Sequence, residues 1–308
     1  MPTALVTHPD CLNHKTPEGH PEQVARLEYV LAALKGKDML REEAPLASDE
    51  LLLRVHPAAH LDAMRKASPE TGRALLDADT WMSPGTLNAA LRAAGGAARA
   101  VDMVMAGSVG NAFVATRPPG HHAEAATPMG FCIFGNVAAA AKHALDHHGL
   151  ARVAIVDFDV HHGNGTQDLV QNDARILFCS THQMPLYPGT GDPSETGAHG
   201  TVLNVALPDG AGGAVFRQVM EGQILPAVDV FAPEMIFISA GFDAHRADPL
   251  AGLNLVEADF AWATQAICDL ADRHCGGRVV SCLEGGYDLA ALASSAAAHV
   301  DILIQCAP

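Results

Sequence analysis

Short apolar, β-branched runs alternate along the chain with longer segments in which apolar residues recur at helical spacing. The runs predict seven strands, at residues 3–8, 111–117, 152–160, 175–181, 201–207, 234–240 and 278–284. The longer segments predict helices at 24–34, 86–107, 136–149, 214–231 and 257–277. This alternation indicates βαβ units, so we expect an α/β fold with a mostly parallel central sheet flanked by helices on both faces.

The pattern gives no sign of a second domain. No internal repeat, low-complexity tract or Ser/Gly-rich linker interrupts it, and 49% of the 308 residues are hydrophobic, enough for one large core. We therefore expect residues 1–308 to form a single domain. The longest irregular segment, residues 182–200, is rich in turn-forming residues and lies between two predicted strands, so it is expected to be a loop bordering a site.

Composition narrows the possible partners. The formal charge of −16 disfavours binding to nucleic acid and favours cationic ligands, such as basic peptides or amines. No apolar run reaches the roughly 18 residues of a membrane span, and the N-terminal residues do not resemble a signal peptide. The seven cysteines are scattered, which is typical of reduced thiols. We expect a soluble, cytoplasmic protein that does not bind membranes.

Polar residues follow five of the predicted strands. These segments read PPGHHAE, HHGNG, HQ, GFDAHRADP and GGYDL. In a parallel sheet the carboxyl ends of the strands share one edge, and open α/β proteins bind ligands at that edge. The polar residues are therefore expected to converge on one pocket.

Three of these residues suit a metal ion. Asp159 and His161 are two positions apart, so in an extended segment their side chains leave the same face, and Asp243 follows another strand. Together they offer two carboxylates and one imidazole. Three protein ligands with room for water are the arrangement of catalytic zinc.

Other residues at these strand ends suit proton transfer. His121 and His122 are adjacent and follow a Pro-Pro-Gly turn, and imidazole titrates near neutral pH. Each histidine needs a partner for its other nitrogen, and Asp157 and Asn164 are the available candidates. Tyr287 follows a Gly-Gly turn, where its hydroxyl could donate to an oxyanion. By contrast, the histidines in the 146–148 segment end a predicted amphipathic helix and are interpreted as ordinary surface residues.

Six ordered motifs resemble those of the zinc-dependent histone deacetylase family. They are RPPGHHAE, GFCIFGNVA, DFDVHHGNGTQ, YPGTGD, SAGFDAHRADPLAG and EGGYDL, spread over residues 117–289, and HPEQVARL at 20–27 extends the resemblance. The resemblance implies the arginase-deacetylase fold and one catalytic zinc held by Asp159, His161 and Asp243. Asn164 is similar to the asparagine of the class II branch.

The same resemblance implies further roles. His121 and His122 would be the catalytic pair, with Asp157 and Asn164 as their partners, and Tyr287 the oxyanion donor. Residues lining the acyl-lysine tunnel would be Gly130, Phe131, Tyr187 and Leu250, with Asp79, or alternatively Asp77, at the rim. A potassium ion is expected at Asp157, Ser180, Thr181 and the backbone of Asp159 and His161. Arg26 matches a family arginine behind the site, or forms a structural ion pair.

The expected activity is hydrolysis of acetyl or other short acyl groups from the ε-amino group of lysine in proteins or peptides. Three alternatives remain. An acetylpolyamine amidohydrolase of the same superfamily would suit an acidic protein, although Leu250 stands where an acidic gatekeeper would be expected. An arginase-like ureohydrolase would use two manganese ions, and an inactive acyl-lysine binding module would lack turnover. The natural substrate, the acyl-chain preference and a possible homo-oligomeric state are left open.

Overall fold

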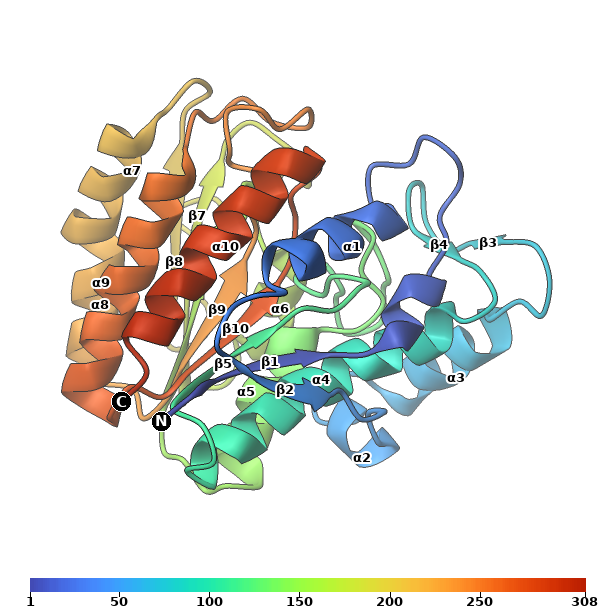
Figure 1. Ribbon diagram of the computed structural model, residues 1–308, viewed down its shortest axis with the longest axis horizontal. Helices are drawn as coiled ribbons and strands as arrows, with labels where there is room; N and C mark the ends of the chain where they lie inside the picture. Colours follow the sequence, from blue (N-terminus) through green and yellow to red (C-terminus); the bar gives the residue numbers. More distant parts are fainter.

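One parallel sheet forms the centre of the protein, whose computed structural model describes all residues 1–308 (Figure 1). Its strands are β1 (Thr3–Thr7), β2 (Leu40–Glu43), β5 (Asn111–Val114), β6 (Val153–Asp157), β7 (Ile176–Gln183), β8 (Val202–Leu207), β9 (Ile236–Ala240) and β10 (Val279–Leu283). They lie in the order β2-β1-β5-β10-β9-β6-β7-β8, and every neighbouring pair is parallel. Two short antiparallel strands, β3 (Ala74–Leu75) and β4 (Trp81–Met82), lie outside this sheet.

Helices connect the strands. They are α1 (Val24–Ala33), α2 (Asp49–Leu52), α3 (Ala58–Ala67), α4 (Thr86–Met105), α5 (Asn136–Asp146), α6 (Asn164–Val170), α7 (Gly213–Val219), α8 (Leu225–Phe231), α9 (Glu257–Cys275) and α10 (Leu289–Gln305). A 3₁₀ turn, η1 (Pro9–Asn13), follows β1, and a π-helical stretch, η2 (Met220–Ile224), joins α7 to α8. No helix combines the length and apolar composition that crossing a membrane requires.

Alternate residues of each strand pack into different cores, as the pleat of a strand requires. Leu5 and Phe113 point into a core shared with α1 and with α7 to α10. Ala4 and Ala112, their chain neighbours, point into the opposite core, which is shared with α4, α5 and α6. The two groups of helices lie on opposite sides of the sheet in Figure 1. The expected α/β architecture, with helices on both faces, is confirmed.

The hydrophobic pattern predicts the buried elements better than the exposed ones. All seven predicted strands are present, although β5 and β6 end earlier than expected, at Val114 and Asp157. The pattern does not predict β2, because its sequence, LREE, is largely exposed at the sheet edge, where charged residues are common. The predicted helix at 214–231 is interrupted by η2 just before Pro226, which has no N–H for a helical hydrogen bond.

Four helices are absent from the predicted pattern: α2, α3, α6 and α10. The first three are short or lie in polar sequence, so they give only a weak periodic signal. Asn164, expected on a glycine turn, instead begins α6. α10 is rich in alanine, and Asp288 caps it by accepting a hydrogen bond from the Ala291 N–H at 2.8 Å.

Candidate functional site

Two carboxylates and one imidazole meet at the carboxyl edge of the sheet. Asp159 and His161 lie in the loop after β6, and Asp243 lies in the loop after β9. His161 Nδ1 is 3.1 Å from Asp159 Oδ1 and 3.1 Å from Asp243 Oδ2. The three side chains are buried, and their ligand atoms form a group that could hold a metal ion. β6 ends at Asp157, before the first of these residues. The loop that follows nevertheless places the side chains of Asp159 and His161 next to each other.

Backbone amides hold this loop in place. The Asp159 N–H donates to Asp157 Oδ1 at 3.1 Å, and the Val160 N–H donates to Asp243 Oδ1 at 2.9 Å. Glycines leave room for the carboxylates: a Cβ at Gly241 would lie 2.1 Å from Asp159 Oδ2, and one at Gly285 2.1 Å from Asp243 Oδ2. Larger residues would therefore displace the carboxylates.

The chemistry of the three side chains fits a divalent cation. Burial lowers the pKa of His161, but the carboxylates of Asp159 and Asp243 outweigh it and raise that pKa to about 10. Two buried carboxylates thus favour a positive charge between them. An O, N, O ligand set of this kind is suited to zinc.

The histidine pair lies beside these ligands, and the two histidines have different partners. His121 Nδ1 is 3.1 Å from Asp157 Oδ2, and His122 Nδ1 is 2.7 Å from Asn164 Oδ1. The Asn164 amide donates its Nδ2 hydrogen to Glu124 Oε1 at 3.0 Å, so its oxygen faces His122. Because that oxygen only accepts, His122 Nδ1 must carry the hydrogen, which leaves a lone pair on Nε2 when the ring is neutral.

The two imidazoles also differ electrostatically. Burial lowers the pKa of His121, but the carboxylates of Asp159 and Asp157 outweigh burial and hold it well above its ordinary value. Burial, reinforced by the charge on His121, holds the pKa of His122 well below its ordinary value. The rings are in contact, with centroids 4.0 Å apart.

A cavity of about 260 Å³ opens onto this group. Its wall includes His122, His161 and Tyr287 at the inner end, and Gly130, Phe131 and Tyr187 along the sides. The Tyr187 ring meets the His122 ring edge to face, with centroids 5.2 Å apart, and Phe131 meets Tyr287 in the same way at 5.8 Å. We call this cavity, which is lined in part by aromatic rings, the tunnel; of the three candidate metal ligands, His161 lines it.

Leu250 and Asp79 also line the cavity, whereas Asp77 does not. The Asp79 backbone oxygen is 3.0 Å from His20 Nε2, and the next residue, Thr80, accepts the Phe131 N–H at 3.0 Å. The segment that carries Asp79 is therefore attached to the tunnel wall.

Ser180 and Thr181 lie on β7, next to the strand that ends at Asp157. Asp157 pairs with Ser180 in the sheet, and both Ser180 and Thr181 are buried. The Ser180 hydroxyl is hydrogen-bonded to His182 Nδ1 at 2.9 Å. Of the residues expected to bind potassium, Asp157, Ser180 and Thr181 thus lie on adjacent strands, and the other two lie in the loop after β6.

Sequence reasoning gave no role to several residues that support the site. Glu284 Oε2 accepts the N–H groups of Gly120 and His121, at 2.7 and 3.1 Å. Asp248 Oδ2 accepts the Tyr287 N–H at 2.7 Å. Both carboxylates lie inside the motifs EGGYDL and SAGFDAHRADPLAG, and that position was the only available signal.

Arg26 is fully buried behind Tyr287. Its guanidinium carbon lies 4.8 Å from the centre of the Tyr287 ring, and its Nε donates to the Gly286 carbonyl at 2.6 Å. It also forms an ion pair with Glu22 at 2.9 Å. Glu22 in turn binds Arg117, so one buried carboxylate serves two arginines. Arg26 therefore forms the structural ion pair and also supports the tyrosine.

Comparisons with known proteins identify the family of the chain. Residues 20–303 match the model of the histone deacetylase domain. A probable deacetylase of Archaeoglobus fulgidus is 40% identical over 298 residues, covering 94% of this chain and 82% of that protein. A histone deacetylase-like amidohydrolase of Pseudomonas aeruginosa is 43% identical, covering 87% of this chain and 71% of that protein. The crystal structure of the HDA15 HD domain superposes with a TM-score of 0.92 at 34% identity, covering 99% of this chain and 88% of that one.

Proposed function

The chain belongs to the histone deacetylase domain family, whose members act as deacetylases or amidohydrolases, and we propose that it is a zinc-dependent lysine deacylase. It would remove acetyl or other short acyl groups from the ε-amino group of lysine in proteins or peptides. The observation that carries the proposal is the shared wall of one tunnel, where His122 and Tyr287 lie beside the candidate ligand His161. We treat residues 1–308 as one catalytic domain of this type.

Asp159, His161 and Asp243 would hold the zinc ion. When bound, zinc would polarise the acyl carbonyl and make a water molecule more acidic. His161 would bind through Nδ1, the nitrogen that now lies between the two carboxylates. The carboxylates are positioned beforehand by backbone N–H groups, so little reorganisation accompanies binding.

His122 is the proposed general base. Its Nδ1 hydrogen is directed at Asn164, which leaves Nε2 free to take a proton from the attacking water. His121, held by Asp157, would complete the pair. After attack, a protonated histidine of the pair would deliver the proton to the leaving amine nitrogen. The products would be acetate, or another short acid, and the free amine.

Tyr287 is the proposed oxyanion donor. Its backbone is fixed by Asp248 and its ring lies over Arg26, so the side chain is held in place before substrate arrives. A donor fixed in this way stabilises charge that develops in the transition state without paying for reorganisation. Phe131 and Tyr187 would enclose the alkyl chain of lysine, and Asp79 at the rim would accept hydrogen bonds from the substrate backbone.

A potassium ion is proposed at the neighbouring strand ends. Its ligands would be Asp157, Ser180 and Thr181, with the backbone oxygens of Asp159 and His161. The support is the burial of all five residues at one sheet edge, where β6 and β7 pair. A positive ion there would offset part of the negative charge of the aspartates.

Acetylated polyamines are the second candidate substrates. The formal charge of −16 and the carboxylate of Asp79 at the tunnel favour a cationic substrate. Leu250, which lines the same tunnel, places an apolar group where an acidic gatekeeper would bind a second amine. An apolar side chain at this position favours an acyl-lysine substrate over an acetylated polyamine.

A two-manganese ureohydrolase is poorly supported. His162, which follows the ligand His161, has both ring nitrogens engaged elsewhere, with Thr190 at 2.8 Å and Gln167 at 2.9 Å. It is therefore not available as a ligand for a second ion.

We propose a cytoplasmic location, consistent with seven free cysteines, six of them buried.

The deciding experiment measures turnover of three substrates on zinc-loaded enzyme: an acetyl-lysine peptide, a longer-acyl lysine peptide and N-acetylputrescine. Peptide turnover that is lost with a chelator and restored by zinc is the expected result. Turnover of N-acetylputrescine alone would overturn the substrate assignment but keep the mechanism. No turnover of any of the three would favour a binding module.

A further inference from the structure

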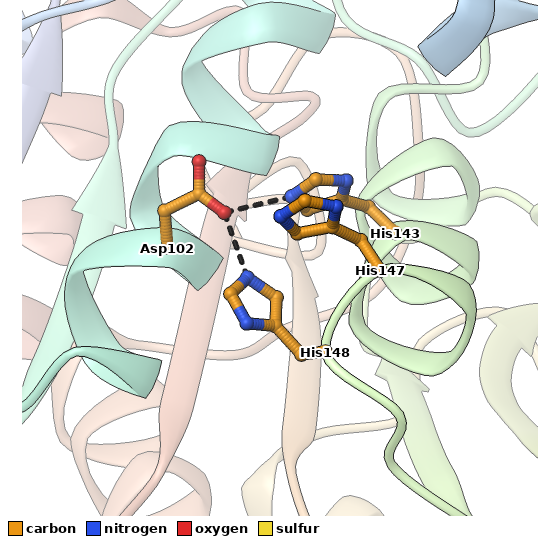
Figure 2. Close-up of side chains that lie close together, drawn as sticks. All are labelled: Asp102, His143, His147 and His148. Carbon is orange, nitrogen blue, oxygen red and sulfur yellow. Dashed lines mark hydrogen bonds and ion pairs between the residues drawn. The ribbon is translucent and has the colours of Figure 1, made fainter.

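A second group of metal-ligating side chains lies where helices α4 and α5 end. It consists of Asp102, His143, His147 and His148, whose candidate ligand atoms all lie within 4.8 Å of one another. Figure 2 shows the Asp102 carboxylate facing the three imidazole rings, of which His143 belongs to α5 and the other two follow the end of that helix. We propose that these four residues form a second binding site for a divalent transition metal, such as zinc.

The contacts of Asp102 bring the site together. Asp102 Oδ1 is 2.7 Å from His143 Nε2 and also 2.7 Å from His148 Nε2. Two imidazoles thus converge on one carboxylate oxygen. Around tetrahedral zinc, ligand atoms at the usual bond length of about 2.0–2.1 Å stand about 3.3 Å apart. A shift of roughly half an ångström at each contact would therefore admit an ion in place of the shared protons.

The spacing of the histidines suits chelation by a helix. His143 and His147 are four residues apart at the end of α5, so both lie on one face. Their rings are nearly parallel, with centroids 4.7 Å apart and planes at 10°, and Figure 2 shows them stacked opposite Asp102. His148 stands almost perpendicular to both, at 87° and 88°. Three imidazoles and a carboxylate are ligands that zinc, copper and nickel accept.

Two further features favour a cation here. α4 and α5 both end at this point, and the carbonyl groups at a helix C-terminus carry partial negative charge. A cavity of about 240 Å³ reaches Asp102, His143 and His147, which gives an ion access and space for a water ligand.

The arginines beside the cavity are already neutralised. Arg54 pairs with Glu50 at 2.9 Å and with Asp146 at 3.3 Å. Arg99 pairs with Glu42 at 2.9 Å. Their charges therefore oppose a bound cation only weakly.

The second site lies on the opposite edge of the sheet from the tunnel. α4 ends shortly before β5 begins at Asn111, and α5 ends shortly before β6 begins at Val153. The second site is thus near the amino ends of the strands, whereas the tunnel residues follow their carboxyl ends. An ion there would join the last turns of two helices and stabilise the fold without touching substrate.

The test is a zinc titration of the untagged protein, with the bound metal counted by mass spectrometry after dialysis. The variant His143→Gln/His148→Gln is expected to bind one ion fewer per chain than the wild type. The affinity of this variant for zinc at the second site should fall by more than ~10–100-fold, which is the loss typical when only a hydrogen-bond partner of a metal ligand is removed. Asp102→Asn, which preserves the shape of the side chain, should weaken binding in the same direction.

The matched control is His199→Gln, which removes an exposed histidine from another loop. It should bind as many ions as the wild type. A parallel titration uses Asp243→Asn as the background, because this change removes a candidate ligand of the tunnel site. Any zinc that is lost from this background when His143→Gln/His148→Gln is added comes from the second site. Zinc should also raise the thermal unfolding midpoint of this background, and less so when the second site is removed. Equal zinc content and affinity in the wild type and both site variants would overturn the proposal.

Discussion

Two consecutive residues of the tunnel wall, Gly130 and Phe131, have left-handed backbone conformations, with φ values of 55° and 69°. This conformation is costly for a residue with a side chain, and Phe131 is held in it by the hydrogen bond from its N–H to Thr80. The motif GFCIF identifies these residues as tunnel candidates, but the backbone twist that aims the phenylalanine is not visible in a linear pattern. The energetic cost of this twist is offset by a contact with Thr80, which is distant in the sequence, so the local motif does not reveal it.

Gly130→Ala should reduce activity strongly. A Cβ at this position would lie 2.4 Å from His122 Cδ2, so the imidazole must move. A displacement of about 1 Å in a catalytic group can cost roughly 100-fold in rate. We expect a loss of this order in kcat/KM on an acetyl-lysine peptide.

Gly107→Ala is the matched control for this change. Gly107 also has positive φ, 66°, but a Cβ there meets nothing within 4 Å. This variant should be destabilised only by the backbone strain, about 1–2 kcal/mol, and should keep the wild-type kcat/KM. Equal activities in the two variants would show that Gly130 has no steric link to His122.

Tyr287→Phe should lower kcat by about 10²–10³-fold, because it removes one oxyanion donor. KM should change little, since the ring still packs against Phe131 and over Arg26. Steady-state kinetics on the acetyl-lysine peptide measure both quantities, and the unfolding midpoint checks that the fold is intact. A variant with near-normal kcat would exclude Tyr287 as the donor.

At the scale of elements, the helices differ in how tightly they approach their neighbours. α4 is rich in alanine and carries two adjacent glycines, Gly95 and Gly96, which sequence reasoning reads only as part of a helix. In the structure a Cβ at Gly95 would lie 2.2 Å from the Pro45 carbonyl oxygen. The helix therefore packs directly on the backbone of the 45–47 segment. Periodicity predicts that α4 exists, but not which of its small residues is in contact, because the contact comes from outside the helix.

Gly95→Ala should destabilise the protein although alanine is the better helix former. The gain in helix propensity is about 1 kcal/mol, whereas the clash with backbone forces α4 away from the 45–47 segment. Overpacking of this kind typically costs about 1–3 kcal/mol, so we expect net destabilisation of up to roughly 2 kcal/mol. Urea unfolding measures the difference.

Gly222→Ala is the comparison for Gly95→Ala. Gly222 is helical and exposed, and a Cβ there meets nothing within 4 Å. The variant should be as stable as the wild type or slightly more so. If both variants are stabilised, the close approach of α4 to the 45–47 segment is not present in solution.

For the whole molecule, the sequence predicts seven of the eight strands of the main sheet but not their order. Seven strands have mostly apolar runs, and polar residues follow five of them, so a shared edge could be inferred. The position of β10 between β5 and β9 could not, because it depends on which helices cover each face. Similarly, Asp159, His161 and Asp243 could be grouped as strand-end ligands. Glu284 and Asp248 bind backbone amides, which leave no trace in the sequence.

Acid should destabilise the folded protein through its buried neutral histidines. Burial lowers the pKa of His56 to about 4 and that of His299 to about 3, from the ordinary histidine value of 6.5. At a pH between the lowered pKa and 6.5, each of these histidines binds more protons in the unfolded chain than in the folded one. The contribution of these two histidines to the free energy of unfolding is therefore complete above about pH 6.5 and is lost as the pH falls toward 4, by about 1.4 kcal/mol per pH unit for each histidine.

Urea unfolding at pH 7, 6 and 5 measures this dependence. His56→Gln should reduce the slope by about 1.4 kcal/mol per pH unit, since it removes one titrating group. His56 accepts the Gly135 N–H at 2.9 Å through Nε2, a contact that protonation breaks. His199→Gln, at an exposed position, should leave the slope unchanged. Equal pH slopes in the wild type and in His56→Gln would contradict this account.

The central place of β10 also affects how the protein is made. β5 pairs only with β1 and β10, and β9 only with β10 and β6, so β10 is the single strand that joins the two halves of the sheet. A ribosome releases the chain from its N-terminus, and residues 279–283 emerge after all the other strands. Until then, β5 and β9 each present an unpaired apolar edge of the kind that aggregates. These two edges therefore stay exposed until late in translation, and Tyr287, only four residues beyond β10, is among the last parts of the site to be placed.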